Sequence, residues 1–206
     1  MDPNEVPTKG NLVRARNSLK LSQQGYELMD KKRNILIREL TKYIEQAKVI
    51  QSTIDEAYTT AYAALQRANI RMGIDNVQMV SRTVSVDESI DVRLRSVMGT
   101  EIPLIRCSEE EGGKPVYSFY STHDSLDEAK AAFLRVKKLT LELAQVETAA
   151  YRLAAGVQKT QKRANALQNI TIPHYEELAK NIQNALEEKE REEFTRLKVI
   201  KKMKTK

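Results

Sequence analysis

The sequence predicts a mainly α fold: a long antiparallel two-helix left-handed coiled coil, with a small β-hairpin-containing head between the helices. Two heptad repeats and one change of period predict it. Apolar residues recur every seven positions from Leu12 to Ala68 and again from Ala129 to Leu167, and a short stretch between these repeats alternates with a period of two. A seven-residue repeat is slightly shorter than two turns of a straight helix, so the apolar stripe winds left-handed around a partner.

The composition agrees with extended helices rather than a compact globule. Of the 206 residues, 30% are charged and 5% are aromatic, and Trp is absent. The 7 Gly and 5 Pro are clustered, and no Pro occurs between Thr8 and Ile102. Few aromatics, many charges and long stretches without helix breakers are typical of long helices.

Charge and cysteine content narrow the function classes. The net charge of +6 permits an acidic partner, but basic residues alternate with acidic ones along most of the chain, which does not favour nucleic acid. The single cysteine excludes an internal disulfide and suits a reducing compartment. We find neither the ~20-residue apolar run of a membrane span nor the apolar core of a signal peptide. We therefore expect a soluble chain without direct membrane insertion.

The first helix is expected over residues 8–74, after a disordered lead over residues 1–7. Thr8 is a plausible N-cap and Gly73 a plausible C-cap. At 1.5 Å per residue this helix would be about 95–100 Å long. Its larger apolar seam residues are Leu19, Met29, Leu36, Leu40, Ile50 and Ile54.

A small head is expected over residues 75–122, where the period changes to two. Val84 and Val86 alternate with polar residues, and Ile90 to Leu94 does the same, which predicts two strands around a turn at residues 87–89. Glycines and prolines from Gly99 to Pro115 indicate loops, and residues 116–120 are a possible third strand.

The second helix is expected over residues 123–200, capped by Asp124 or Ser125. Pro173 removes one backbone donor, so we expect a kink near residue 173. Residues 201–206 form a basic tail, which is more often a solvated end than a binding site. The larger seam residues of this helix are Val136, Leu139, Leu143, Val146, Leu153 and Leu167.

Two long helices joined by a head of this length are expected to run antiparallel, and their pairing at the head end sets the register. Pairing Met72 with Leu126 in an antiparallel arrangement places Arg33 opposite Asn165. Arg33 is a polar residue at a seam position, and it meets the polar stretch from Lys162 to Asn165. A buried polar position of this kind can determine register or mark a contact with another protein.

No constellation of catalytic residues is found in the sequence. The run Gly112–Lys114 lacks the spacing of a phosphate-binding loop and no helix follows it. His174 and Glu177 lie three residues apart, which is a weak metal signal and more typical of an exposed helix face. We expect no catalytic, cofactor-binding or metal residue.

Several motifs resemble one family, the D subunits of the V-type and A-type ATPases and ATP synthases. Lys162–Gln168 (KRANALQ) followed by Ile172-Pro173 is similar to the family's Arg-Arg-Val-Asn-Ala-Leu-Glu and Ile-Pro. Glu190–Lys198 (EREEFTRLK) resembles the family's acidic-aromatic-basic run near its C-terminus. Gly25–Leu28 and Lys31–Asn34 resemble N-terminal family segments. These matches cover both long helices, and the head matches only in layout.

Two positions depart from the family pattern. Lys162 replaces an arginine and does not keep its bidentate geometry, and Gln168 replaces an acid. If the family's shaft meets its stator through an ion pair there, that contact is weakened here. The candidate residues for a contact with the ring or for the register are Arg33, Lys162, Arg163, Asn165 and Gln168.

The resemblance implies a non-catalytic central-stalk rotor subunit that transmits torque to an ion-translocating membrane rotor for protons or sodium ions. Its implied partners are the catalytic and non-catalytic ring subunits (A and B type), a small stalk subunit (F type) and the funnel-shaped membrane-rotor subunit (C/d type). The implied location is cytoplasmic, peripheral on the membrane as part of the complex. The candidate residues of the end inserted into the ring are Arg191, Phe194, Arg196, Leu197 and Lys198.

Two alternatives stay open from the residues alone. A generic coiled-coil scaffold or tether shares the helices but requires no head. A basic nucleic-acid-binding protein requires a concentrated basic stripe, which is found only at the tail. Binding to ATPase ring subunits, or salt-dependent binding to DNA, separates these readings.

Overall fold

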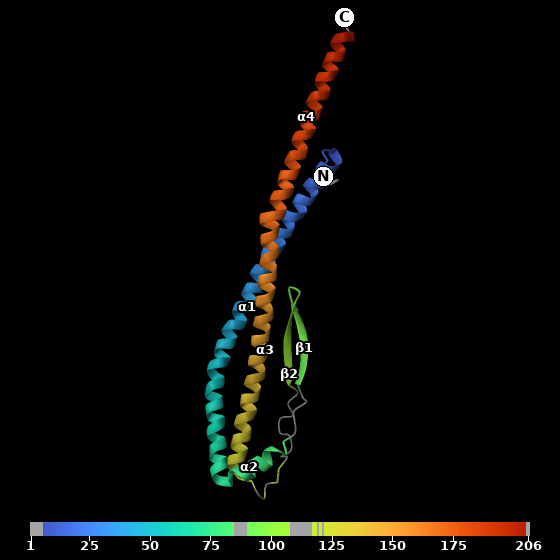
Figure 1. Cartoon of the computed structure of the whole chain (residues 1–206). Coiled ribbons are helices and arrows are strands. Elements are labelled where there is room, and N and C mark those ends of the chain that lie inside the picture. Colours follow the sequence, from blue (N-terminus) through green and yellow to red (C-terminus); the bar gives the residue numbers. More distant parts are fainter. Residues whose placement is uncertain (1–5, 85–89, 108–116, 119, 121, 205–206) are drawn as a thin grey trace. The chain divides into compact units, whose positions relative to one another are not determined.

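The computed structural model describes residues 6–84, 90–107, 117–118, 120 and 122–204. The described residues are mainly helical, and a β-hairpin lies between the long helices in chain order (Figure 1). By its internal contacts the chain divides into two compact units. The first comprises Met1–Asn34 and Val157–Lys206, and the second comprises Ile35–Gly156.

Helix α1 (Lys9–Met72) begins at the predicted cap. The Asn11 N–H donates to Thr8 Oγ1 at 3.1 Å, and the Leu12 N–H donates to the Thr8 carbonyl at 3.0 Å. These bonds satisfy donors that a helix start leaves without partners. The helix ends at Gly73, whose φ of 85° is accessible to glycine at little cost. A short helix that the sequence did not predict, α2 (Ile74–Ser81), follows directly.

In the second unit, the later part of α1 pairs antiparallel with the first part of α3 (Asp124–Ala166). Arg71 forms an ion pair with Asp124 at 3.0 Å, Arg67 forms one with Glu128 at 3.4 Å, and the Tyr62 ring meets Phe133 edge to face at 5.7 Å. The residues buried on these two segments are mostly small or aliphatic: Leu36, Ile54, Ala61, Ala64, Ala68, Ala129, Val136, Val146, Ala149 and Leu153. Alanines at this seam let two helices approach closely.

In the first unit, the start of α1 pairs antiparallel with the end of α3 and with α4 (Ile172–Lys204). Arg16 donates to Gln183 Oε1 at 2.8 Å, and Lys9 forms an ion pair with Glu190 at 3.2 Å. Ala15, Thr160, Ala164 and Ile182 are buried in this unit. The larger apolar residues at the predicted seam positions of both units are all buried or half-buried, so heptad spacing located the packed faces.

The strand predicted over Ile90–Leu94 is present, but its partner in the hairpin is the segment that follows it rather than the one predicted before it. Strand β1 (Ile90–Val97) pairs antiparallel with β2 (Thr100–Cys107), with Val97 opposite Thr100. The turn is Met98-Gly99, with φ values of 49° and 75°. Two central residues with positive φ define a type I′ turn, which matches the twist of the flanking strands. The expected turn at residues 87–89 lies outside the described residues.

Two further strand predictions differ from the structure. Val84 lies in a bend rather than in a strand, and Val86 is outside the described residues. Of the possible strand over 116–120, the residues Tyr117, Ser118 and Tyr120 are not in a strand. Tyr117 instead packs against the apolar cluster of Ala68, Val77 and Leu126. Packing of its ring against this cluster explains where Tyr117 lies, whereas the alternating sequence pattern does not.

The irregularity expected near Pro173 is a π-helical turn, η1 (Leu167–Thr171), just before α4. The Ile172 N–H donates to the Leu167 carbonyl, five residues back rather than four. Pro173 has no N–H, so an α-helical ladder would leave the carbonyl of residue 169 without a donor. A π turn is one way in which a helix accommodates such a gap. Helix α4 then continues to Lys204, so Lys201, Lys202 and Lys204 of the expected tail are helical.

Within the described part of the chain, no helix combines the length and the apolar character that crossing a membrane requires.

Candidate functional site

A polar cluster crosses the helix pair of the first unit at Arg33. The guanidinium group contacts Asp30 on its own helix, and it donates to Gln161 Oε1 on α3 at 2.8 Å. Gln161 Nε2 in turn donates to Asn165 Oδ1 at 2.8 Å, and Asn34 donates to Asp30 Oδ2 at 3.2 Å. Arg33 is thus linked to Asn165 through one intermediate side chain.

The polar cluster is partly buried, so its hydrogen bonds can help to fix the register of the two helices. The Arg33 and Asp30 side chains are 25% and 32% exposed. A charge in such a position is stable when its hydrogen bonds are made, and removal of one partner leaves the other poorly solvated. Sliding the helices by one turn would separate Arg33 from Gln161.

The other candidate residues of this region lie outside the cluster. Lys162, Arg163 and Gln168 are exposed on the outer side of the pair. Asp30 and Gln161 belong to the cluster although the sequence reading did not single them out. Each lies about one turn from a candidate residue on its own helix, Asp30 from Arg33 and Gln161 from Asn165, and their role becomes visible only once the two helices are paired.

The end of α4 is a single exposed helix. Lys9 at the start of α1 pairs with Glu190, and every residue of α4 from Arg191 to Lys204 is exposed. Figure 1 shows this end of α4 extending past the start of α1. Phe194, Leu197 and Met203 are 69%, 65% and 73% exposed. The candidate residues Arg191, Arg196 and Lys198 lie on the same exposed segment.

Charge is separated along this segment. Residues 187–193 contain five glutamates against Lys189 and Arg191, whereas residues 194–204 contain Arg196 and four lysines without any acid. Basic residues in the last turns complement the negative end of the helix dipole. The final turns therefore present a basic surface interrupted by large apolar side chains.

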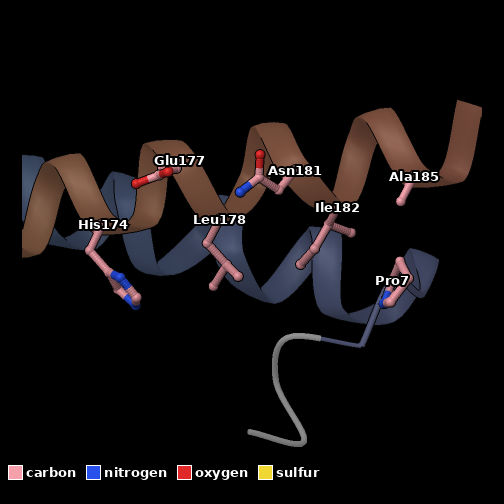
Figure 2. A pocket seen from close by; sticks show the side chains of 7 residues that line it. All are labelled: Pro7, His174, Glu177, Leu178, Asn181, Ile182 and Ala185. Atoms are coloured by element: carbon pink, nitrogen blue, oxygen red, sulfur yellow. The ribbon is translucent and has the colours of Figure 1, made fainter. Parts of the chain in front are cut away.

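A shallow groove lies beside the start of α1 in the same unit, with a volume of about 500 Å³. Figure 2 shows Leu178 and Ile182 turned toward the ribbon of α1, with Pro7 at its end. His174, Glu177, Asn181 and Ala185 complete the lining. Across the described ranges, no group of three or more His, Cys, Asp or Glu side chains could hold a metal ion. His174 and Glu177 remain a pair on one helix.

An apolar groove of about 480 Å³ lies on the second unit, near the start of α3. Its walls come from α1, α2 and α3, and they include Leu65, Val77, Leu126, Phe133 and Leu134. Leu134 is 48% exposed, and two members of the buried cluster of Ala68, Val77 and Leu126, namely Val77 and Leu126, line the groove. An exposed groove lined by large apolar groups is a candidate docking surface for another protein.

Two titratable groups near the start of α3 have shifted pKa values. The Asp124 carboxylate accepts hydrogen bonds from His123 and from the Ser125 N–H, and these bonds lower the pKa of Asp124. Burial and the hydrogen bond that Tyr117 donates to Asp127 raise the pKa of Tyr117 to about 12. Tyr117 also lines the apolar groove of this unit, and local hydrogen bonds and burial account for both pKa shifts.

Comparison with known proteins places these features in a family. The family model for the ATP synthase D subunit matches residues 11–202. The chain is 41% identical to the D subunit of a V-type ATP synthase of Thermotoga neapolitana, over 95% of this chain and 96% of the relative. It is 36% identical to the D subunit of an A-type ATP synthase of Methanopyrus kandleri, over 95% and 84%, and 34% identical to that of Pyrococcus abyssi, over 95% and 92%.

Proposed function

Because the chain belongs to the ATP synthase D subunit family, we propose that it is the central-stalk rotor subunit of a V/A-type rotary ATPase. In this role it transmits torque between the ring that hydrolyses or makes ATP and the membrane rotor that moves protons or sodium ions. The proposal extends beyond the names of the relatives, which identify them as subunits of ATP synthases.

The exposed end of α4 is the observation that carries the proposal. A single helix with Phe194 and Leu197 more than half exposed gains little from burial in its own fold. Burying one such side chain in a partner is worth about 1.5–3 kcal/mol. A socket formed by A-type and B-type ring subunits would supply that burial, with Arg191, Arg196 and Lys198 available for polar contacts around its rim.

The helix pair suits the transmission of torque. Two helices that interlock along a seam resist twisting more than one helix does, because relative movement must unpack buried side chains. In the first unit the Arg33–Gln161 hydrogen bond opposes sliding of one helix along the other. Lys162, Arg163 and Gln168 are exposed at the same level, so we assign them to contacts with the surrounding ring.

The apolar groove of the second unit is our candidate for the other end of the stalk. Leu126, Phe133 and Leu134 offer an apolar surface to the small F-type subunit or to the C/d-type funnel subunit. In this assignment the chain is peripheral to the membrane, which it reaches through its partner. Catalysis, cofactors and metal ions belong to other subunits of the complex.

Reconstitution with the ring tests this function. The full chain is mixed with A-type and B-type subunits of the same ATP synthase, and co-elution and ATPase activity are measured. We expect a stable complex whose ATPase activity changes when this chain is added. A chain that elutes alone is a coiled-coil scaffold of another kind, and salt-dependent DNA binding without ring binding would favour the nucleic-acid alternative.

A further inference from the structure

The hairpin has two outer edges, and the turn determines which backbone groups point to them. In a two-residue hairpin the pair next to the turn, Val97 with Thr100, exchanges hydrogen bonds, and the next pair does not. Residues 101, 103 and 105 therefore direct their backbone groups away from β1. Two bonds agree with this: the Ile105 N–H donates to Gln145 Oε1 at 2.7 Å, and Arg152 Nη1 donates to the Glu101 carbonyl at 3.2 Å.

The outer edge of β2 is closed by the chain itself. Gln145 and Arg152 both belong to α3, and Figure 1 shows β2 between α3 and β1. The outward position between them is Pro103, which has no N–H to leave without a partner. Ile102 is 1% exposed, which anchors this strand to the unit.

Within the described residues, nothing pairs with the outer edge of β1. Ile90, Val92, Leu94 and Ser96 face the outward residues of β2, so their own N–H and C=O groups point away from β2. Among the described residues none accepts or donates a hydrogen bond at this edge. Val92 and Leu94 are 57% and 59% exposed, and Ile90 is 39% exposed. An open edge of this length, with apolar side chains and no proline or lysine, is a template for another strand.

Charge on the other face of β1 selects the kind of strand. Arg93, Arg95 and the cross-strand Arg106 share this face with one acid, Asp91, which accepts from Arg93 Nε at 2.8 Å. With three arginines against one acid this face has a net positive charge, so pairing of β1 with β1 of a second copy would bring two positively charged faces together even where Asp91 lies opposite an arginine. A strand with acidic residues on that face would instead place opposite charges beside Arg93 and Arg95, which is stabilising.

We propose that β1 extends its sheet by pairing with an extended segment of another protein, in which apolar residues alternate with acidic ones. The apolar residues pack beside Val92 and Leu94, and the acidic residues lie beside Arg93 and Arg95. Main-chain hydrogen bonds to residues 90, 92, 94 and 96 supply affinity, and the alternation supplies specificity. The proposal depends on the proposed function in one respect: it places the segment in another component of the same ATP synthase.

Amide hydrogen exchange with residue resolution tests the pairing directly. It is measured on the free full chain and on the assembled ATP synthase. We expect the outward amides of Val92, Leu94 and Ser96 to exchange at least 100-fold more slowly in the assembly. Rapid exchange at these amides in an intact assembly overturns the pairing and leaves the proposed function standing. Failure of the wild-type chain to join any other component of the complex overturns both.

A variant pair separates edge pairing from folding of the hairpin. Val92→Pro removes one outward donor and keeps the hydrogen bonds between β1 and β2, as Pro103 does on β2. Val92→Thr keeps the donor and serves as the matched control. We expect Val92→Pro to lower the affinity of the chain for the other subunits of the ATP synthase about tenfold, because one or two hydrogen bonds are lost. The melting temperature of the free chain should not change. Equal affinity of both variants, or protection that depends on dimerisation of the chain, contradicts the proposal.

Discussion

At the residue scale, the structure depends on a few completely buried side chains. Leu36, Leu153 and Ile182 are at most 2% exposed, whereas their neighbours on the same helices are largely solvated. Two paired helices bury side chains along only one seam, so neighbouring side chains cannot easily fill a cavity left there. Each of these side chains therefore carries a large share of the local packing energy.

Substitution at Leu153 measures that share. We predict that Leu153→Ala lowers the free energy of unfolding by about 2–5 kcal/mol, because the lost contacts leave a cavity. Tyr151→Ala is the control, since Tyr151 is 78% exposed, and we expect a change of about 0.5 kcal/mol or less. Urea unfolding followed by circular dichroism gives both values. A loss at Leu153 no larger than that of the control would contradict the burial described here.

Tyr117 provides a prediction in pH. Its pKa is raised to about 12 by burial and by the Asp127 carboxylate. The folded state keeps this proton where the unfolded state loses it, so Tyr117 contributes stability below pH 10 that is lost as the pH rises toward 12. Absorbance of tyrosinate at 295 nm should show a late ionisation that the Tyr117→Phe variant lacks. Identical titration curves for the two proteins would refute this assignment.

Individual side chains were predictable from the sequence where periodicity alone decides burial. Leu36 and Leu153 lie at heptad positions and are buried. Asp30 and Gln161 were not singled out, because their role depends on the position of Arg33 across the helix pair. A pattern along one helix does not contain that information until the register is known.

At the scale of elements, the hairpin shows where pattern reading failed. From the sequence alone, Gly99 and Pro103 predict loops because both interrupt strands on average. Here Gly99 supplies a positive φ in the turn, and Pro103 occupies an outward position that requires no donor. Both residues are compatible with a hairpin once the turn is placed at Met98-Gly99. Their positions therefore reflect the turn and the outer edge of β2 rather than a loop.

Close packing between α3 and the hairpin gives a prediction at this scale. A Cβ on Gly156 would lie 2.8 Å from Thr100 Oγ1, whereas a Cβ on Gly10 would meet no atom within 4 Å. Replacing a helical glycine by alanine gains up to about 1 kcal/mol. We therefore expect Gly10→Ala to stabilise slightly and Gly156→Ala to destabilise by about 1 kcal/mol or more, since the hairpin must shift.

A double-mutant cycle checks the cause of that loss. Thr100→Ala removes both Thr100 atoms that approach the new methyl group. In this background Gly156→Ala should regain most of the lost stability, and melting curves of the four proteins measure the coupling. Additive effects of the two substitutions would show that the hairpin does not pack against Gly156 in solution.

At the scale of the whole molecule, the exposed end of α4 allows function to be tested without disturbing the fold. Residues 191–204 are exposed, so their removal should change the melting temperature little. We predict that a chain ending at Glu190 folds normally and binds the ring subunits at least tenfold more weakly. Size-exclusion chromatography and thermal unfolding measure the two effects. Undiminished ring binding would remove the basis for assigning this end to the ring.

The long helices and their antiparallel pairing were accessible from the sequence because both arise from one repeating pattern. The short helix α2 and the position of the hairpin were not, because they depend on how a few loop residues meet the helix pair. The family assignment came from short motifs near Pro173 and Phe194, which the comparisons extend to residues 11–202. These observations concern the fold and the family, and rotation of this chain inside the ring is the part of the proposed function that goes beyond them.

Single-molecule rotation tests that claim most directly. A bead is attached to a cysteine introduced at the exposed Tyr151, in a Cys107→Ser background, and the ring of A-type and B-type subunits is fixed to a surface. We predict unidirectional stepwise rotation of the bead when ATP is added, and its arrest when this chain is crosslinked to the ring. A chain that stays bound and stationary while the ring hydrolyses ATP at its full rate would contradict a rotor role.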